Sequence, residues 1–184
     1  CIYLAITTLW NSMKTTTARW MAVALAALAP LTAQAAAVTV SAAASLSNAL
    51  REVAPLFEAA HPGMPVRLNF GASGALLAQI SKGAPVDVFI SADQETMDRA
   101  QAQGLVPAAQ RRDVVSNTLV VVVPAARGMP PRALGDLTQP AYTRIAIGLP
   151  ASVPAGRYTQ RALEAAGLWG VTEPRMIGAH NVRQ

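Results

Sequence analysis

The feature that most constrains the fold is a regular alternation between short β-branched runs and stretches with helical periodicity. This order is typical of strand–helix–strand units, in which parallel strands form a sheet that helices cover. We predict strands at 38–43, 66–70, 86–92, 118–124, 144–150 and 176–180. We predict helices from Leu46 to the stop at 61–63, and over 75–81, 94–103 and 154–166. The chain is therefore expected to be an α/β protein.

The run at 118–124 differs from the other predicted strands because it is nearly all valine. Such a run is expected either to be buried on both faces of a sheet or to connect two lobes. A stretch rich in proline and glycine follows at 126–136 and predicts a surface loop. The chain then stops at Gln184, in what looks like the opening of another helix, so we expect the second lobe to be incomplete.

The N-terminal region has the organisation of a secretion signal. Two basic residues precede an apolar run at 20–31, which has the length of a signal-peptide core and is too short to span a bilayer. A small-x-small cleavage pattern follows this run. We therefore predict upstream read-through over 1–12, a signal peptide over 13–35 and a mature chain that starts near Ala36.

Composition narrows the function further. The single cysteine, Cys1, lies in the part that processing would remove, so no disulfide or thiolate metal site is expected in the mature protein. The formal net charge of +5 comes mainly from scattered arginines without interleaved aromatic residues, which argues against a nucleic-acid partner. His61 and His180 have no further ligand at metal-binding spacing. Ser45 lacks the glycine-flanked elbow of a hydrolase nucleophile, and no catalysis is expected.

Three predicted strand-to-helix junctions share one design, in which a strand is followed by small residues and then a helix. They are centred on Ser45, Ser73 and Ala155. Each leaves backbone N–H groups free at a helix N-terminus, where the helix dipole also favours negative charge. A serine before a helix is by itself more often a cap. Because all three junctions follow the carboxyl ends of strands, where open α/β sheets bind ligands, we favour an anion site.

Six segments resemble the periplasmic molybdate-binding proteins in their order and spacing. They are AAASLSNAL, FGASGALLAQI, GAPVDVFISADQETMD, NTLVVVVP, AIGLPASVPAGRYTQRAL and HNVRQ. The pieces ISADQ and VPAG-x-Y are the most specific. The resemblance covers 38–184 and implies a two-lobed periplasmic-binding-protein-like fold of type II, each lobe a mostly parallel sheet flanked by helices. It implies a first lobe over 36–117 and an incomplete second lobe over 118–184.

The resemblance also implies how the ligand is held. Ser45 and Ser73 would each donate a hydroxyl and a backbone N–H to molybdate, and Ala155 and Val182 would each donate a backbone N–H. Molybdenum would then be bound only as the oxyanion, without a direct protein ligand, and no cofactor is expected. A tyrosine ligand of the family would lie beyond Gln184. A site built from donors alone favours an unprotonated dianion, because the O–H of a protonated phosphate would stay unpaired at about 1–3 kcal/mol.

The function implied is that of an exported, monomeric receptor in the periplasm, which captures molybdate or tungstate and delivers it to the permease of an ABC transporter. A receptor for sulfate or thiosulfate is the alternative, although the two specific pieces disfavour it. A sensor domain of a transcription regulator would carry a helix-turn-helix and no signal peptide. Asp87 and Asp93 are interpreted as cap and turn residues, since a carboxylate in the cleft would repel an anion. Leu149 stands where the family often has an aspartate.

Overall fold

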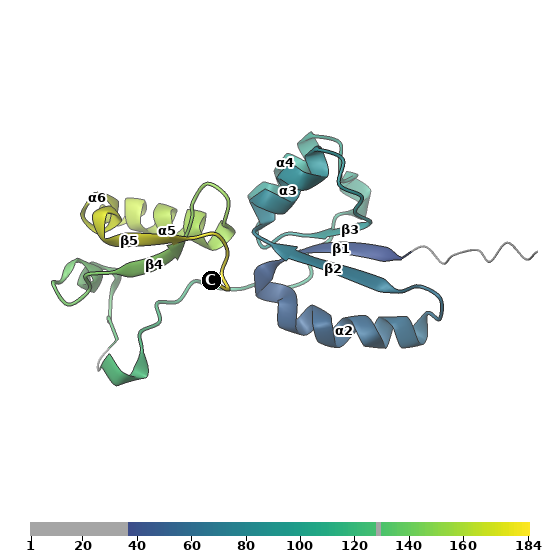
Figure 1. Ribbon diagram of the computed structural model, residues 1–184. Helices are drawn as coiled ribbons and strands as arrows, with labels where there is room; N and C mark the ends of the chain where they lie inside the picture. Colours follow the sequence, from purple (N-terminus) through teal and green to yellow (C-terminus); the bar gives the residue numbers. More distant parts are fainter. Residues whose placement is uncertain (1–36, 128–129) are drawn as a thin grey trace, which may run out of the picture. The chain divides into compact units, whose positions relative to one another are not determined.

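The computed structural model describes residues 37–127 and 130–184 of the chain (Figure 1). Residues 36–184 form one compact unit, and this unit holds two parallel sheets. The predicted signal peptide at 13–35 and the predicted read-through at 1–12 lie outside the described residues. The predicted α/β class is confirmed, because both sheets are parallel and their strands are connected through helices.

The first sheet, called sheet A below, contains β1 (Val38–Ala43), β2 (Val66–Gly71) and β3 (Val88–Ile90) in the order β2-β1-β3. β1 is the central strand and pairs in parallel with both neighbours. Its last four residues are all buried, which small and β-branched side chains allow in a strand covered on both faces.

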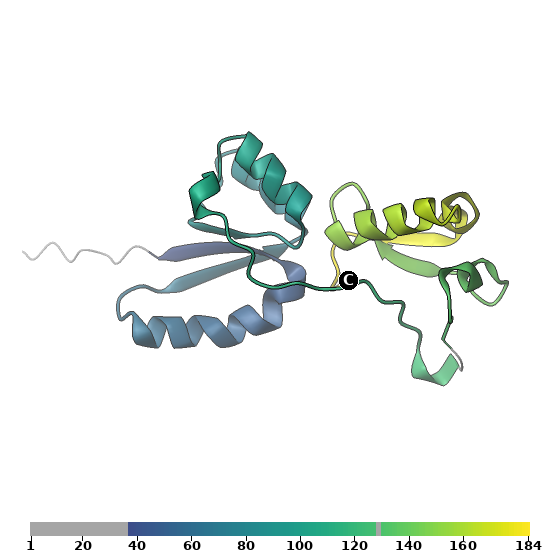
Figure 2. The ribbon, with the colours of Figure 1, turned by 180° about the vertical axis from the view of Figure 1, so that it is seen from behind.

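Helices cover both faces of sheet A. The short 3₁₀ helix η1 (Ala44–Leu46) and α2 (Ser47–Ala60) follow β1, α3 (Ser73–Ser81) follows β2, and α4 (Gln94–Ala102) follows β3. Figure 1 shows α2 on one face and α3 with α4 on the other, and Figure 2 shows the same arrangement from behind. This is the layering that the alternating sequence pattern predicts.

The second sheet, called sheet B below, contains β4 (Ile145–Gly148) and β5 (Met176–Ala179) in parallel. Three elements connect the two strands: α5 (Pro154–Ala165), α6 (Trp169–Thr172) and the 3₁₀ helix η5 (Glu173–Arg175). α5 begins with a proline in its first turn, where the missing N–H would have had no helical partner. Its predicted start at 154 is confirmed.

Each sheet has its own apolar core. On sheet A, Leu76 and Leu77 of α3 are only 2% and 1% exposed. On sheet B, Val153 and Leu163 are likewise 2% and 1% exposed. Burial of such side chains contributes about 1.5–3 kcal/mol each, so these four residues are major contributors to the packing of α3 and α5.

A glycine follows the C-terminal end of each of two helices. Gly104 follows α4 with a φ of +71°, and Gly167 follows α5 with a φ of +70°. A residue with a Cβ is strained in this left-handed region, which is why glycine is the usual residue just past a helix C-terminus.

The predicted strand at 118–124 is wrong for the described chain. The segment pairs with no other strand among residues 37–127 and 130–184, and Val120 and Val122 are 76% and 84% exposed. Valine favours strands only when a neighbouring strand packs beside it, so composition alone does not make this segment a strand. The segment instead connects sheet A to sheet B along the chain, which was the other expectation.

The predicted surface loop at 126–136 is partly ordered into short turns. It overlaps the 3₁₀ helices η3 (Ala125–Arg127) and η4 (Leu134–Thr138). In η4 the carboxylate of Asp136 accepts hydrogen bonds from the N–H groups of Arg132 and Ala133, and these two bonds lower the pKa of Asp136. No helix in the described part of the chain is long and apolar enough to cross a membrane.

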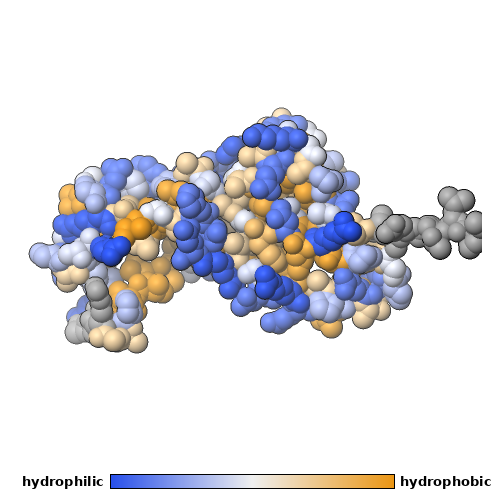
Figure 3. All heavy atoms as spheres, in the orientation of Figure 1, coloured by the Kyte–Doolittle hydropathy of each residue, from blue (hydrophilic) through white to orange (hydrophobic). Residues whose placement is uncertain are grey.

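Figure 3 shows apolar surface in the part of the molecule that holds β1, β2 and β3. β3 is an edge strand of sheet A as described, and its Val88 is 41% exposed. On sheet B, Ile177 of β5 is 42% exposed. Both sheets therefore carry apolar side chains that the described elements cover only in part.

Candidate functional site

The parallel register places two of the predicted site residues at one edge of sheet A. Ala43 at the end of β1 pairs with Gly71 at the end of β2. Ser45 follows the first of these strand ends and Ser73 follows the second. Both residues therefore lie at the carboxyl edge of the sheet, where open α/β folds bind ligands.

Sheet B repeats this arrangement. Gly148 at the end of β4 pairs with Ala179 at the end of β5. Ala155 lies in the first turn of α5, which follows β4, and Val182 lies in the segment that follows β5. The carboxyl edges of the two sheets thus carry two predicted site residues each.

Neither serine acts as a helix cap, although that is the commoner role of a serine before a helix. The N-cap of α3 is Ala72, and Ser73 is the first helical residue; the N-cap of α2 is Leu46. Ser45 lies in η1 and is exposed, whereas Ser73 is fully buried. The Ser73 Oγ accepts a hydrogen bond of 3.0 Å from the N–H of Ala92, so its own hydroxyl proton remains able to donate.

The four predicted residues share one property, which is an unpaired backbone donor. Within residues 37–127 and 130–184, the N–H groups of Ser45, Ser73, Ala155 and Val182 donate to no protein acceptor. The N–H of Gly156, the residue after Ala155, is by contrast paired and donates to the carbonyl of Val153 at 3.0 Å. The structure therefore offers backbone donors at the carboxyl ends of β1, β2, β4 and β5.

Two hydrogen bonds join the edge of sheet A to the edge of sheet B within the compact unit. The N–H of Gly74, next to Ser73, donates to the carbonyl of Ser152 at 3.1 Å. An added Cβ on Gly74 would lie 2.9 Å from that carbonyl oxygen, so only glycine allows this approach. The Nε of Arg183, next to Val182, donates to the carbonyl of Ala44 at 3.3 Å.

The glycine of the VPAG-x-Y segment has a steric role. A Cβ on Gly156 would overlap the carbonyl of Gly148, and a Cβ on Gly148 would overlap the side chain of Val153. The first turn of α5 therefore packs directly on the end of β4. This contact fixes the position of the Ala155 N–H relative to sheet B.

The interpretation of Asp93 as a cap is corrected by the structure. Asp93 occupies the N-cap position of α4 but makes no side-chain cap bond. Its carboxylate is 2.5 Å from the guanidinium of Arg157 and accepts a bond of 3.0 Å from the Ser91 hydroxyl. Burial raises the pKa of Asp93, but hydrogen bonds from Arg157 and Thr96, together with the positive charge, outweigh it and hold this pKa below its ordinary value.

Asp87 and the two histidines have local structural partners. Asp87 accepts the N–H of Thr39 at 2.8 Å and so fixes the start of β1. His61 stacks on Phe57 at the end of α2, with ring centroids 4.3 Å apart, and the N–H of His180 donates to the Gln184 side chain at 2.7 Å. The described residues contain no group of three or more side chains that could hold a metal ion.

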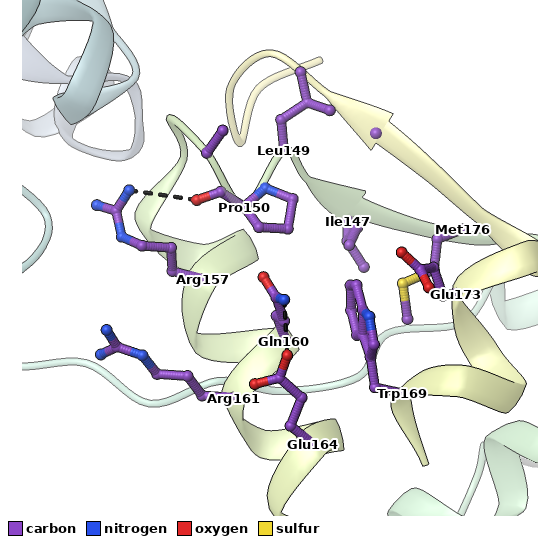
Figure 4. A pocket seen from close by; sticks show the side chains of 12 residues that line it. Ile147, Leu149, Pro150, Arg157, Gln160, Arg161, Glu164, Trp169, Glu173 and Met176 are labelled. Atoms are coloured by element: carbon purple, nitrogen blue, oxygen red, sulfur yellow. Dashed lines mark hydrogen bonds between the residues drawn. The ribbon is translucent and has the colours of Figure 1, made fainter. Parts of the chain in front are cut away.

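Leu149 stands where the family often has an aspartate, and its side chain makes apolar contacts. Its N–H donates to the carbonyl of Ala179 at 2.8 Å, which continues the pairing of β4 with β5. Its side chain covers Gly178, where an added Cβ would overlap it. Leu149 also lines the cavity drawn in Figure 4.

This cavity, of about 760 Å³, lies against sheet B. It contains none of the four predicted site residues, and Trp169 faces it together with Ile147 and Met176 (Figure 4). Two carboxylates and two guanidinium groups also line it, those of Glu164, Glu173, Arg157 and Arg161. The cavity and the predicted donor set are therefore different features.

Sequence reasoning missed the pairing of Asp93 with Arg157 and the contact of Gly74 with Ser152. One signal for the pair was present, because the two opposite charges stand inside the two most specific segments, ISADQ and VPAG-x-Y. The glycine contact had no such signal.

The family of bacterial extracellular solute-binding proteins matches residues 38–184. A molybdate-binding protein of Escherichia coli is 39% identical over 152 residues, which are 79% of this chain and 58% of that protein. A molybdate-binding protein of Haemophilus influenzae is 33% identical over 180 residues, which are 93% of this chain and 68% of that protein. The chain spans 58% and 68% of the lengths of these two relatives, and the predicted family resemblance is confirmed.

Solved structures agree in fold. The periplasmic molybdate-binding protein of Azotobacter vinelandii has a TM-score of 0.58 at 25% identity, over 80% of this chain and 64% of that one. The sulfate-binding protein of Mycobacterium tuberculosis has a TM-score of 0.69 at 20% identity, over 80% and 58%, and shows the fold alone. The predicted periplasmic-binding-protein-like fold is confirmed. The chain thus belongs to the family of bacterial extracellular solute-binding proteins.

Proposed function

We propose that the protein is an exported receptor that binds molybdate or tungstate as a tetrahedral dianion and delivers it to the permease of an ABC importer. The observation that carries this proposal is the set of four unpaired backbone N–H groups at the carboxyl ends of β1, β2, β4 and β5. These belong to Ser45, Ser73, Ala155 and Val182, which we propose as ligand residues.

The chemistry of these donors suits an oxyanion without a basic partner. The Ser73 hydroxyl already accepts from Ala92, so its proton is available for an anion oxygen. The Ala155 N–H lies in the first turn of a 12-residue helix, where the helix dipole favours negative charge. Several such dipoles together stabilise a buried dianion without any lysine or arginine ligand.

A donor-only site also selects among oxyanions. A protonated phosphate would leave its O–H unpaired, at about 1–3 kcal/mol, which weakens binding by about 5- to 150-fold. Sulfate carries no such proton, so its rejection has to rest on the smaller size of its tetrahedron. A preference for sulfate or thiosulfate is therefore the second outcome to be tested. The names of the two relatives as molybdate-binding proteins favour molybdate.

Location and partners form the second part of the proposal. The family is extracellular, and the predicted signal peptide at 13–35 would direct the chain to the periplasm. There the protein would act as a monomer, without a cofactor, without catalysis and without binding nucleic acid. Closure of the two sheets around the anion would create the form that the permease recognises, because a ligand shifts a hinge equilibrium through its contacts with both sides.

The test is calorimetric titration of molybdate, sulfate and phosphate into the mature form of the complete gene product, which is expected to start near Ala36. Ser73→Ala removes the buried hydroxyl donor and should weaken molybdate binding about tenfold or more. Ser81→Ala is the matched control on the same helix, because the Ser81 hydroxyl bonds the carbonyl of Leu77 and lies outside the donor set. A folded protein that takes up no molybdate, or that binds sulfate more tightly, would overturn the proposal.

A further inference from the structure

The side chain of Arg157 joins the donor loops of the two sheets. It projects from α5, two residues after Ala155, and its guanidinium contacts the Asp93 carboxylate at 2.5 Å and the Thr96 hydroxyl at 3.0 Å. Its other amino group donates to the carbonyl of Pro150 at 3.4 Å, a contact visible in Figure 4. One guanidinium thus holds the loop after β4, the first turns of α5 and the start of α4.

The far end of this contact lies beside Ser73. Asp93 directly follows Ala92, whose N–H donates to the Ser73 hydroxyl. The Asp93–Arg157 pair therefore connects two proposed ligand residues. On one side lies Ala92, the hydrogen-bond partner of Ser73, and on the other lies the helical turn that carries Ala155. The geometry points to Arg157 as a positioning residue that sets the Ala155 donor of sheet B against the Ser73 donor of sheet A, an inference that rests on the proposed function.

Burial indicates that the pair has a role beyond stability. The side chain of Asp93 is 1% exposed and that of Arg157 is 11% exposed. Taking both charges out of water consumes most of their mutual attraction, and apolar replacements of such pairs are often as stable. The planar guanidinium makes several directed bonds at once and so fixes the orientation of the segments that it contacts. An apolar contact at this place would not fix that orientation.

The charge of Arg157 has a second consequence for the ligand. An unpaired carboxylate at Asp93, so close to Ser73, would repel a bound dianion. Arg157 offsets that charge at contact distance while touching none of the four proposed ligand residues. The proposed site can therefore remain a set of neutral donors although an aspartate stands next to it.

A neighbouring ion pair provides the matched control. Arg161 lies one helical turn after Arg157 and bridges Glu95 of α4 at 2.6 Å. Its side chain is 62% exposed, and exposed bridges of this kind contribute little. Arg161→Met removes this exposed bridge between the same two helices and leaves the Asp93–Arg157 contact in place, while Glu95 keeps its own contact of 3.7 Å with the Nε of Arg157.

The experiment measures molybdate affinity in the full-length gene product that carries Arg157→Met, Arg157→Lys, Asp93→Asn or Arg161→Met. We expect the two Arg157 variants to weaken binding about tenfold or more. Asp93→Asn loses the ion pair but also removes a charge that repels the dianion, so it should weaken binding less than either Arg157 variant. Arg161→Met should change affinity less than about twofold. Arg157→Lys is decisive for orientation, because lysine keeps the charge and loses the planar set of donors.

Circular dichroism at the temperature of the titration separates positioning from folding, because a variant that is almost fully folded there loses no apparent affinity to the unfolded state. Unchanged affinity in Arg157→Lys and Arg157→Met would overturn the inference while leaving the proposed function intact. If Arg157→Met does not fold, Arg157→Lys, which keeps the charge and most of the side-chain length, decides in its place. An unaltered protein without molybdate binding would instead remove the proposed function itself, and this inference with it.

Discussion

Gly156→Ala tests whether the first turn of α5 depends on direct contact with the end of β4. The new methyl group would overlap the Gly148 carbonyl, which is main chain and unable to rotate away. Overpacking of this kind destabilises by about 1–3 kcal/mol. The better helix propensity of alanine returns about 1 kcal/mol. We therefore expect a net loss of up to about 2 kcal/mol in the free energy of unfolding.

The matched control is Gly170→Ala in α6, where an added Cβ meets no atom within 4 Å. That change should leave stability unaltered or raise it by up to about 1 kcal/mol. Urea unfolding followed by circular dichroism measures both variants. Because the Ala155 N–H belongs to the displaced turn, Gly156→Ala should also weaken molybdate binding. Equal unfolding midpoints for the two variants would refute the steric reasoning.

Two further predictions concern acid stability and the core. The folded pKa of Asp93 lies below the ordinary value of 3.8, so its contribution to stability is full above that value and is lost as the pH falls through the folded pKa. Melting temperatures from about pH 5 to pH 2 should therefore fall less steeply in Asp93→Asn than in the unaltered protein, and parallel curves would contradict this. The side chain of Leu163 is 1% exposed, so Leu163→Ala should lower the free energy of unfolding by about 2–5 kcal/mol, as measured by urea titration. A loss below about 1 kcal/mol would mean that α5 packs loosely.

Most of the fold could be predicted because local signals and tertiary packing agree. The run at 38–43 is β1 to the residue, and the proline and glycine that bracket α5 stand where helix termini require them. The run at 118–124 has the strongest strand composition in the chain and still has no partner in the described residues. A strand needs a second segment to pair with, and the composition of one segment does not show whether such a partner is present.

The sequence predicts which strand-to-helix junctions contribute to the candidate site, but it does not predict how these junctions lie relative to one another. The register of β1 with β2 places the junction at Ser45 beside the junction at Ser73. This register depends on how the two strands pair, which the sequence of neither strand alone specifies. The contact of Arg157 with Asp93 joins residues 64 positions apart, so it depends on how α5 meets α4. Neither helix pattern contains that information.

The direction of β1 gives the molecule two chemically distinct ends. β1 is the first strand in the described part of the chain and also the centre of sheet A, and the proposed ligand loops follow the carboxyl ends of the strands. Whatever is attached before Val38 must therefore leave from the opposite edge, about 20 Å away across the six residues of the strand. A dye, an affinity tag or a surface linker attached just before Val38 should therefore leave the proposed ligand loops accessible.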